Sequence, residues 1–218
     1  MTTSAEFQTR TDLHAEFDRQ VAVLVQKGYP HAAGVEPAEF LERVSALKDL
    51  LGNGGADSAA PYPFVLVITS ELVPASSAIE LVERRDKPGF SVLDSDDLRR
   101  FEPIDAVELP RGPAYLALGV DTGQRRRNVR PDDALAQIEA AGRSPLTIDE
   151  GIALITAHPE AVAKNGGFSL AGSRCGDRRV CALWISDSRP KLGWCWAGNP
   201  HTWLGTASCA ARVGVPVP

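Results

Sequence analysis

The sequence predicts an α+β fold, with N-terminal helices, mixed elements in the centre and a C-terminal antiparallel β-meander covered by helices. Before residue 52, apolar residues recur at the three- and four-residue spacing of amphipathic helices. After residue 168, short strand-like runs are separated by Gly, Asp, Asn and Pro. Helices that come mostly first and hairpins that come mostly last favour α+β over an alternating α/β fold.

Two helices are expected at the N-terminus, over residues 12–27 and 37–51. The segment 53–63 that follows is rich in Gly, Ala, Ser and Pro, which is typical of a flexible connector. We therefore expect residues 1–52 to form a helical hairpin, attached as an appendage to a main α+β domain of residues 64–218.

The centre of the chain predicts mixed elements. The apolar runs 64–69 and 115–120 are expected to be buried strands, and 90–93 a short strand. Residues 94–101 predict a short helical turn, whereas 78–82 fits a helix or a strand equally well.

Two further helices have clear start signals. Pro131 begins the first, with acidic residues in its first turn. Thr147 and Glu150 form a capping box, Thr-x-x-Glu, ahead of an apolar stretch that ends near His158. The four strands of the expected meander then cover residues 168–174, 180–186, 192–197 and 202–208.

Composition excludes several classes of protein. The chain has 218 residues and a formal net charge of −5, which argues against sequence-independent nucleic-acid binding. Its longest apolar run, Phe64–Ile68, is far shorter than the roughly 20 residues of a membrane span. No signal peptide is visible, so we expect a cytoplasmic protein whose cysteines are thiols or metal ligands. The sequence leaves its oligomeric state open.

Tryptophan and cysteine are concentrated in the last quarter of the chain. All four tryptophans lie between Trp184 and Trp203, and all four cysteines between Cys175 and Cys209. Strand alternation places Trp194 and Trp196 on one face and Cys195 on the other. Indoles on strands are often core residues, but here a polar turn of Gly, Asn, Pro and His interrupts the cluster.

Our first functional hypothesis is a small-molecule-binding protein with a tryptophan-lined pocket near residues 194–203. Indoles would form the walls, and polar side chains would orient the ligand. The candidate ligand-binding residues are Trp194, Trp196, Trp203, Asn199, His201 and Arg174.

Two alternatives remain open. One is an enzyme that uses Cys and His chemistry in the same region, with Cys195 or Cys175 as nucleophile, His201 as base, or zinc as a cofactor. No Cys-x-x-Cys pair is present, so we assign no metal ligand, cofactor or catalytic residue. The other is a protein-interaction module with exposed tryptophans.

A basic cluster, Arg125, Arg126, Arg127 and Arg130, precedes the helix that starts at Pro131. It is able to hold a phosphate or carboxylate, but a solvated loop is the simpler interpretation.

Two stretches resemble an uncharacterised family from actinobacteria, a domain of unknown function. They are Gly142–Gly151, with the sequence GRSPLTIDEG, and the string LGWCWAGNPHTWLG, which runs from Leu192 to Gly205. The resemblance covers residues 115–212 and carries no known activity. It implies a bacterial cytosolic setting and transfers no catalytic residues.

Overall fold

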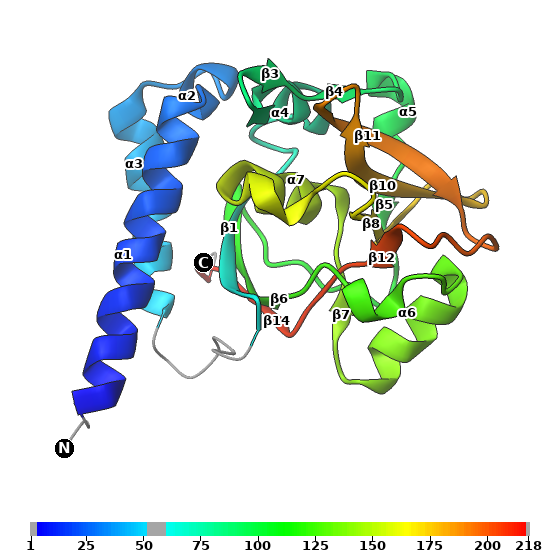
Figure 1. The fold of residues 1–218 in the computed structure, drawn as a ribbon. Coiled ribbons are helices and arrows are strands. Elements are labelled where there is room, and N and C mark those ends of the chain that lie inside the picture. The colour runs from blue at the N-terminus through cyan, green and yellow to red at the C-terminus, as the bar shows by residue number, and fades with distance from the viewer. Residues whose placement is uncertain (1–3, 52–59, 217–218) are drawn as a thin grey trace.

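The computed structural model describes residues 4–51 and 60–216, with side chains from residue 13 onward. Figure 1 shows three parts side by side. The N-terminal helices lie on one side, a small sheet and helix α7 in the middle, and a larger sheet on the other side. The α+β class is confirmed.

The N-terminal segment forms α1 (Ser4–Gln26), α2 (Tyr29–Ala32) and α3 (Pro37–Ser45), and continues as a 3₁₀ helix, Ala46–Leu50. Both predicted helices are present, although the second loses its α-helical geometry after Ser45. Phe17, Leu24 and Phe40 belong to the same hydrophobic cluster as the central strands. The division into appendage and main domain stays a prediction, and most of its linker lies outside the described residues. No helix in the described ranges is long and apolar enough to cross a membrane.

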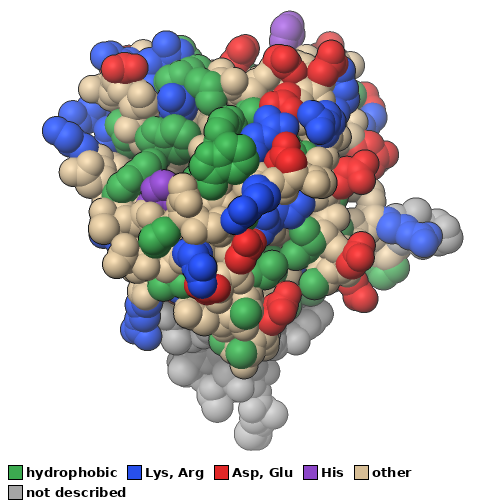
Figure 2. Space-filling view, turned by 90° about the vertical axis from the view of Figure 1, so that its right-hand side faces the viewer, with side chains coloured by type: hydrophobic (Ala, Val, Ile, Leu, Met, Phe, Trp, Pro, Cys, Tyr) green, Lys and Arg blue, Asp and Glu red, His purple; other side chains and the backbone are tan. Residues whose placement is uncertain are grey.

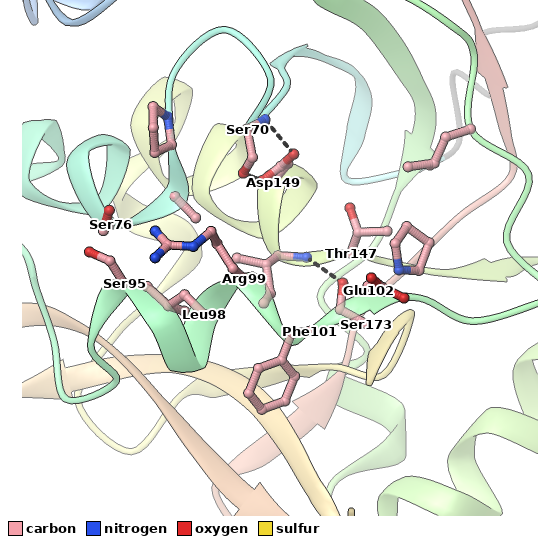
Figure 3. Close-up of a pocket in the computed structure, with 15 residues that line it drawn as sticks. Ser70, Ser76, Ser95, Leu98, Arg99, Phe101, Glu102, Thr147, Asp149 and Ser173 are labelled. Carbon is pink, nitrogen blue, oxygen red and sulfur yellow. Dashed lines mark hydrogen bonds between the residues drawn. The ribbon is translucent and has the colours of Figure 1, made fainter. Parts of the chain in front are cut away.

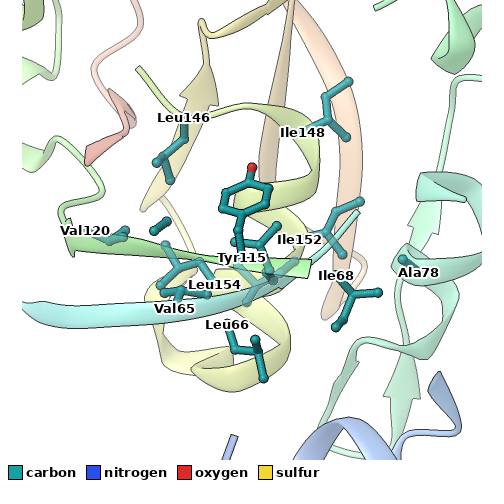
Figure 4. Close-up of a cluster of buried hydrophobic side chains, with 14 of the residues drawn as sticks. Val65, Leu66, Ile68, Ala78, Tyr115, Val120, Leu146, Ile148, Ile152 and Leu154 are labelled. Carbon is teal, nitrogen blue, oxygen red and sulfur yellow. The ribbon is translucent and has the colours of Figure 1, made fainter. Parts of the chain in front are cut away.

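The middle sheet has the order β1–β6–β14, with every pair antiparallel. Its strands are β1 (Tyr62–Ile68), β6 (Ala114–Val120) and β14 (Ala211–Val213). All seven residues of β6 are buried. Figure 4 shows its Tyr115 and Val120 among side chains of β1 and α7. The chain therefore places its continuous apolar runs in the centre of the core, as their composition predicts.

The larger sheet has the order β12–β8–β10–β11–β4. Strands β8 (Gly167–Leu170), β10 (Arg179–Ser186) and β11 (Arg189–Trp196) form three of the four strands of the predicted antiparallel meander. The prediction for the fourth, 202–208, is wrong in direction, because that segment pairs with β8 in parallel and ends at Thr206. The edge strands β12 (Leu204–Thr206) and β4 (Phe90–Ser91) join it in parallel. Asp187 and Ser188, both with positive φ, form the two-residue turn between β10 and β11.

The remaining elements are short. The predicted strand 168–174 is divided into β8 and a second strand at Ser173–Arg174. Between them, Gly172 lies so close to the backbone that a Cβ there would be 2.6 Å from the oxygen of Pro145. The ambiguous segment 78–82 belongs mainly to a helix, α4. The other helices are α4 (Ala75–Leu81), α5 (Ser95–Arg99), α6 (Pro131–Ala140) and α7 (Ile148–Ala157), with 3₁₀ turns at Gln124–Arg126 and Pro159–Ala161. The other strands form three separate pairs: β2 (Glu83–Arg84) with β3 (Lys87–Pro88), β5 (Glu102–Pro103) with β9 (Ser173–Arg174), and β7 (Ser144–Pro145) with β13 (Ser208–Cys209).

Helix α7 is the central element. The predicted capping box is present, with Thr147 and Glu150 each accepting a hydrogen bond from the other's backbone N–H. Nearly every residue of the helix is buried. Gly151 lies so close to β8 that a Cβ there would be 2.4 Å from Leu170 Cδ2. The helix thus packs between the two sheets, and a larger residue at Gly151 would have to displace the side chain of Leu170.

A buried ion pair joins α7 to the C-terminal strand. Arg212 of β14 donates to Glu150 through Nε (2.5 Å) and Nη2 (2.9 Å), and the two side chains are 5% and 1% exposed. The hydroxyl of Tyr115 also donates to Glu150, and Arg212 donates to Ser144 Oγ and the carbonyl of Pro145. Burial alone would lower the pKa of Arg212, but the pair with Glu150 holds that pKa above its usual value.

We predict that Arg212→Ala lowers the free energy of unfolding by about 3–5 kcal/mol, because it leaves the Glu150 carboxylate buried without a countercharge. Urea unfolding followed by tryptophan fluorescence measures this loss. The control is Arg43→Ala, which breaks an exposed pair with Glu39 on α3 and should cost about 0.3–0.5 kcal/mol. Equal losses in the two variants would contradict the prediction.

Candidate functional site

The β10–β11 register fixes which face each tryptophan occupies. Trp194 is paired with Cys181 and Trp196 with Arg179, so these four side chains share one face. Cys195 is paired with Val180 and points to the opposite face, as strand alternation predicts. The indoles of Trp194 and Trp196 meet edge to face at 4.9 Å and are 36% and 46% exposed. Figure 2 shows hydrophobic surface among charged side chains on the side of the molecule that carries this hairpin.

Trp203 and His201 lie on the other face of the sheet. Trp203 packs with Trp184 at 5.8 Å, and its indole lies 5.7 Å from the ring of His201. Trp184 and Trp203 border a small apolar cluster that contains Val180 and Cys195. The structure therefore separates Trp203 and His201 from Trp194 and Trp196.

Arg174 and His201 lie near the start of α6. Arg174 donates to Asp132 Oδ1 (2.8 Å), and the carbonyl of His201 accepts from the backbone N–H of Asn128 (2.9 Å). Asn199 is exposed, in a turn closed by its N–H and the carbonyl of Trp196. None of the six predicted ligand-binding residues lines either cavity described below, and their role stays a prediction.

The cysteines are all thiols in environments that favour the protonated form. Burial raises the pKa of Cys195 to about 11 and that of Cys209 to about 12, and it also raises the pKa of Cys181. Within the described part of the chain, no hydrogen bond joins His201 to a cysteine. No group of three or more His, Cys, Asp or Glu side chains is placed to hold a metal ion there.

A cavity of about 330 Å³ lies where the starts of α4 and α7 meet α5 and the β5–β9 pair. Most of its wall is apolar. The lining residues are Ser70, Pro74, Ala75, Ser76, Ser95, Leu98, Arg99, Phe101, Glu102, Pro103, Leu109, Thr147, Ile148, Asp149 and Ser173.

Asp149, in the first turn of α7, is one of two carboxylates that line this cavity, and the less exposed of the two. Its Oδ2 accepts from the backbone N–H of Ser70 (2.7 Å) and its Oδ1 from the Ser70 hydroxyl (2.5 Å). Figure 3 shows this pair on one side of the cavity, with Phe101 on the opposite side. Burial raises the pKa of Asp149, and the bonds from Ser70 oppose that shift. Among the residues described, no Lys, Arg or His forms an ion pair with Asp149.

The other polar groups of the cavity are mostly engaged. Ser173 Oγ accepts from the backbone N–H of Ile148 (3.1 Å), and Thr147 Oγ1 accepts from that of Glu150. Arg99 forms an ion pair with Asp96 at an exposed site, and Glu102 is exposed at the rim. Thr147 and Ser173 are both buried, so their side chains mainly hold the start of α7 in place.

No pattern in the sequence predicted this cavity. The capping box predicted the start of α7 and hence the position of Asp149 in its first turn, a site where acidic residues are common for reasons of helix stability. The contact of Asp149 with Ser70 was not predictable, because Ser70 follows β1 and lies 79 residues earlier in the chain.

A second cavity, of about 520 Å³, lies beside the start of β1 and the turn after β6. It includes Arg125 of the predicted basic cluster, together with Asp121, Arg143 and Glu160. Arg143 already donates to Ser208 and to the carbonyl of Gly119. Because acidic and basic side chains are mixed there, the cavity gives no specific support to an anion site.

One family model matches the chain, over residues 23–215, and is described as a family of unknown function, DUF5701. The match covers most of the sequence, so the chain belongs to this family. No curated protein and no solved structure is similar enough to the chain to match it.

We predict that Cys175, the only half-exposed cysteine, is the first to be alkylated in the native protein. Its pKa is raised by burial and by the hydrogen bond that its thiol donates to Asp177 (3.2 Å). Asp177→Asn removes that charge, so iodoacetamide should modify Cys175 several-fold faster at pH 8, as measured by peptide mass spectrometry. An unchanged rate would show that Asp177 does not control this thiol.

Proposed function

We propose that this member of the DUF5701 family binds a small organic molecule in the cavity between α4, α5 and the start of α7. Binding pockets are mostly apolar concavities of about 300–1,000 Å³ with a few placed polar groups. The cavity, at about 330 Å³, falls at the lower end of that range and is formed mainly by Leu98, Phe101, Ile148 and prolines.

The observation that carries this proposal is the state of Asp149. Asp149 is half-buried, and a carboxylate that is partly withdrawn from water usually has a cationic partner, because desolvation penalises its charge. Asp149 has two neutral donors from Ser70 instead, and no ion pair among the described side chains. Perturbed acidic groups that face a cavity are concentrated at functional sites.

A hydrogen bond links the β10–β11 hairpin, which carries Trp196, to the helix α5 that lines this cavity. Arg179, paired with Trp196 across the hairpin, donates to Asp97 of α5, with Nη2 at 2.9 Å from Oδ1. The next residue of α5, Leu98, lines the cavity. Tryptophan fluorescence is therefore a suitable readout of binding.

A second candidate function is protein interaction through Trp194 and Trp196. Their exposure supports it, because large apolar side chains exposed side by side are common at interfaces. The two functions differ in their requirements, since docking on this face needs the indoles and leaves the cavity free.

The four free thiols support a cytoplasmic location, where cysteines remain reduced.

We predict that a panel of amino acids, amines, nucleosides and sugars contains a compound that raises Tm by about 5–10 °C at a hundredfold excess over Kd. Ser76→Phe, which places a ring in the cavity, should abolish that shift. The matched control is Glu80→Phe, one turn later on α4 and exposed outside the cavity. Differential scanning fluorimetry measures Tm, and native mass spectrometry gives the stoichiometry. A compound that stabilises Ser76→Phe as strongly as the unmodified protein binds elsewhere and would contradict the proposal.

A further inference from the structure

We infer that the ligand of this cavity is a small organic amine, whose ammonium group pairs with Asp149 and whose hydrocarbon part lies against Leu98 and Ile148. The inference rests on the proposed function and adds the chemical class of the ligand to it.

The first argument is the charge of the lining. Asp149 and Glu102 are acidic, and among the described residues Arg99 is the only basic one that lines the cavity. Arg99 is 71% exposed and is paired with Asp96, which does not line the cavity. The carboxylate of Asp149 thus lines the cavity without a countercharge from the described residues, and a cationic ligand would supply that positive charge.

The second argument is the hydrogen-bonding capacity of Asp149. An ionised carboxylate offers about four lone-pair positions, and Ser70 fills one on each oxygen. The two bonds hold the carboxylate in one orientation at the cavity wall (Figure 3). An ammonium group has three donors and no acceptor, so it matches the acceptor positions that remain.

The third argument excludes an anionic ligand at the start of α7. Helix N-termini attract anions through free N–H groups. Here Ser173 accepts from the N–H of Ile148, and Thr147 accepts from that of Glu150. The carboxylate of Asp149 itself lies in the first helical turn. Two of the first three N–H groups of the helix are thus engaged within the chain, and the carboxylate of Asp149 would repel an anion there.

The fourth argument concerns the rest of the ligand. Leu98 and Ile148 are buried residues on facing elements that line the cavity, and Phe101 and Leu109 extend the apolar wall. Phe101 already stacks with Arg179, whose Cζ lies 5.5 Å from the ring centroid. The hydrocarbon part of the ligand thus meets mainly aliphatic side chains, and the volume limits it to a small compound.

The test compares three probes of one shape and different charge: benzylamine, benzyl alcohol and benzoate. Isothermal titration calorimetry on the full chain should show benzylamine binding at least about tenfold more tightly than benzyl alcohol, and benzoate more weakly than either. Asp149→Asn should remove the preference for benzylamine, so that benzylamine and benzyl alcohol bind this variant with similar affinities. Glu102→Gln, at the exposed rim, should reduce the preference by less than Asp149→Asn.

Each outcome decides the inference. Equal affinities for benzylamine and benzyl alcohol, or tightest binding of benzoate, would overturn it, and so would the absence of binding by all three probes. If benzyl alcohol binds as well as benzylamine and Ser76→Phe abolishes both, the amine inference fails while the proposed small-molecule function stands. If Asp149→Asn does not fold, the order of the three affinities in the unmodified protein still decides.

Discussion

The buried ion pair between Glu150 and Arg212 is the interaction on which the rest of the structure depends. Its carboxylate receives hydrogen bonds from the N-cap of α7, from Tyr115 of β6 and from Arg212 of β14. Arg212 also donates to both residues of β7. Because both charges are buried, each needs the other, and the pair fixes the start of the central helix against the middle sheet.

Asp149, the acidic residue directly before Glu150, has no cationic partner among the described residues. Asp149 and Glu150 are consecutive, but they point to different surroundings because successive helical residues are about 100° apart. Glu150 faces the core and has a cationic partner. Asp149 faces a cavity and receives only neutral donors. The ion pair holds α7 in position, and thereby holds the unpaired carboxylate at the cavity wall. The residue that stabilises the core, Glu150, and the carboxylate of the candidate site, Asp149, therefore lie in the same helical turn.

Local patterns predicted most of the elements, but not the contacts that create the site. The capping box Thr147–Glu150 and the alternation in β10 and β11 depend on residues close in sequence, and both were confirmed. The contacts of Asp149 with Ser70 and of Glu150 with Arg212 span 79 and 62 residues, so no local period contains them. Strand alternation also holds only within a strand. After Ala197 the chain leaves β11 and passes along the start of α6, which brings Trp203 to the face opposite Trp194.

The part of the cavity wall that α5 forms depends on the β10–β11 hairpin, which carries Trp194 and Trp196. Helix α5 has five residues, too few to be stable alone. Asp94 caps it, Leu98 anchors it in the core, and Arg179 of β10 binds its Asp97. The bond from Arg179 holds the pKa of Asp97 below its usual value, so the contact persists in mildly acidic solution. A ligand that stabilises α5 also stabilises the position of Arg179, next to Trp196. Since such coupling is reciprocal, a partner that binds Trp196 and shifts Arg179 should change the affinity of the cavity for the proposed amine.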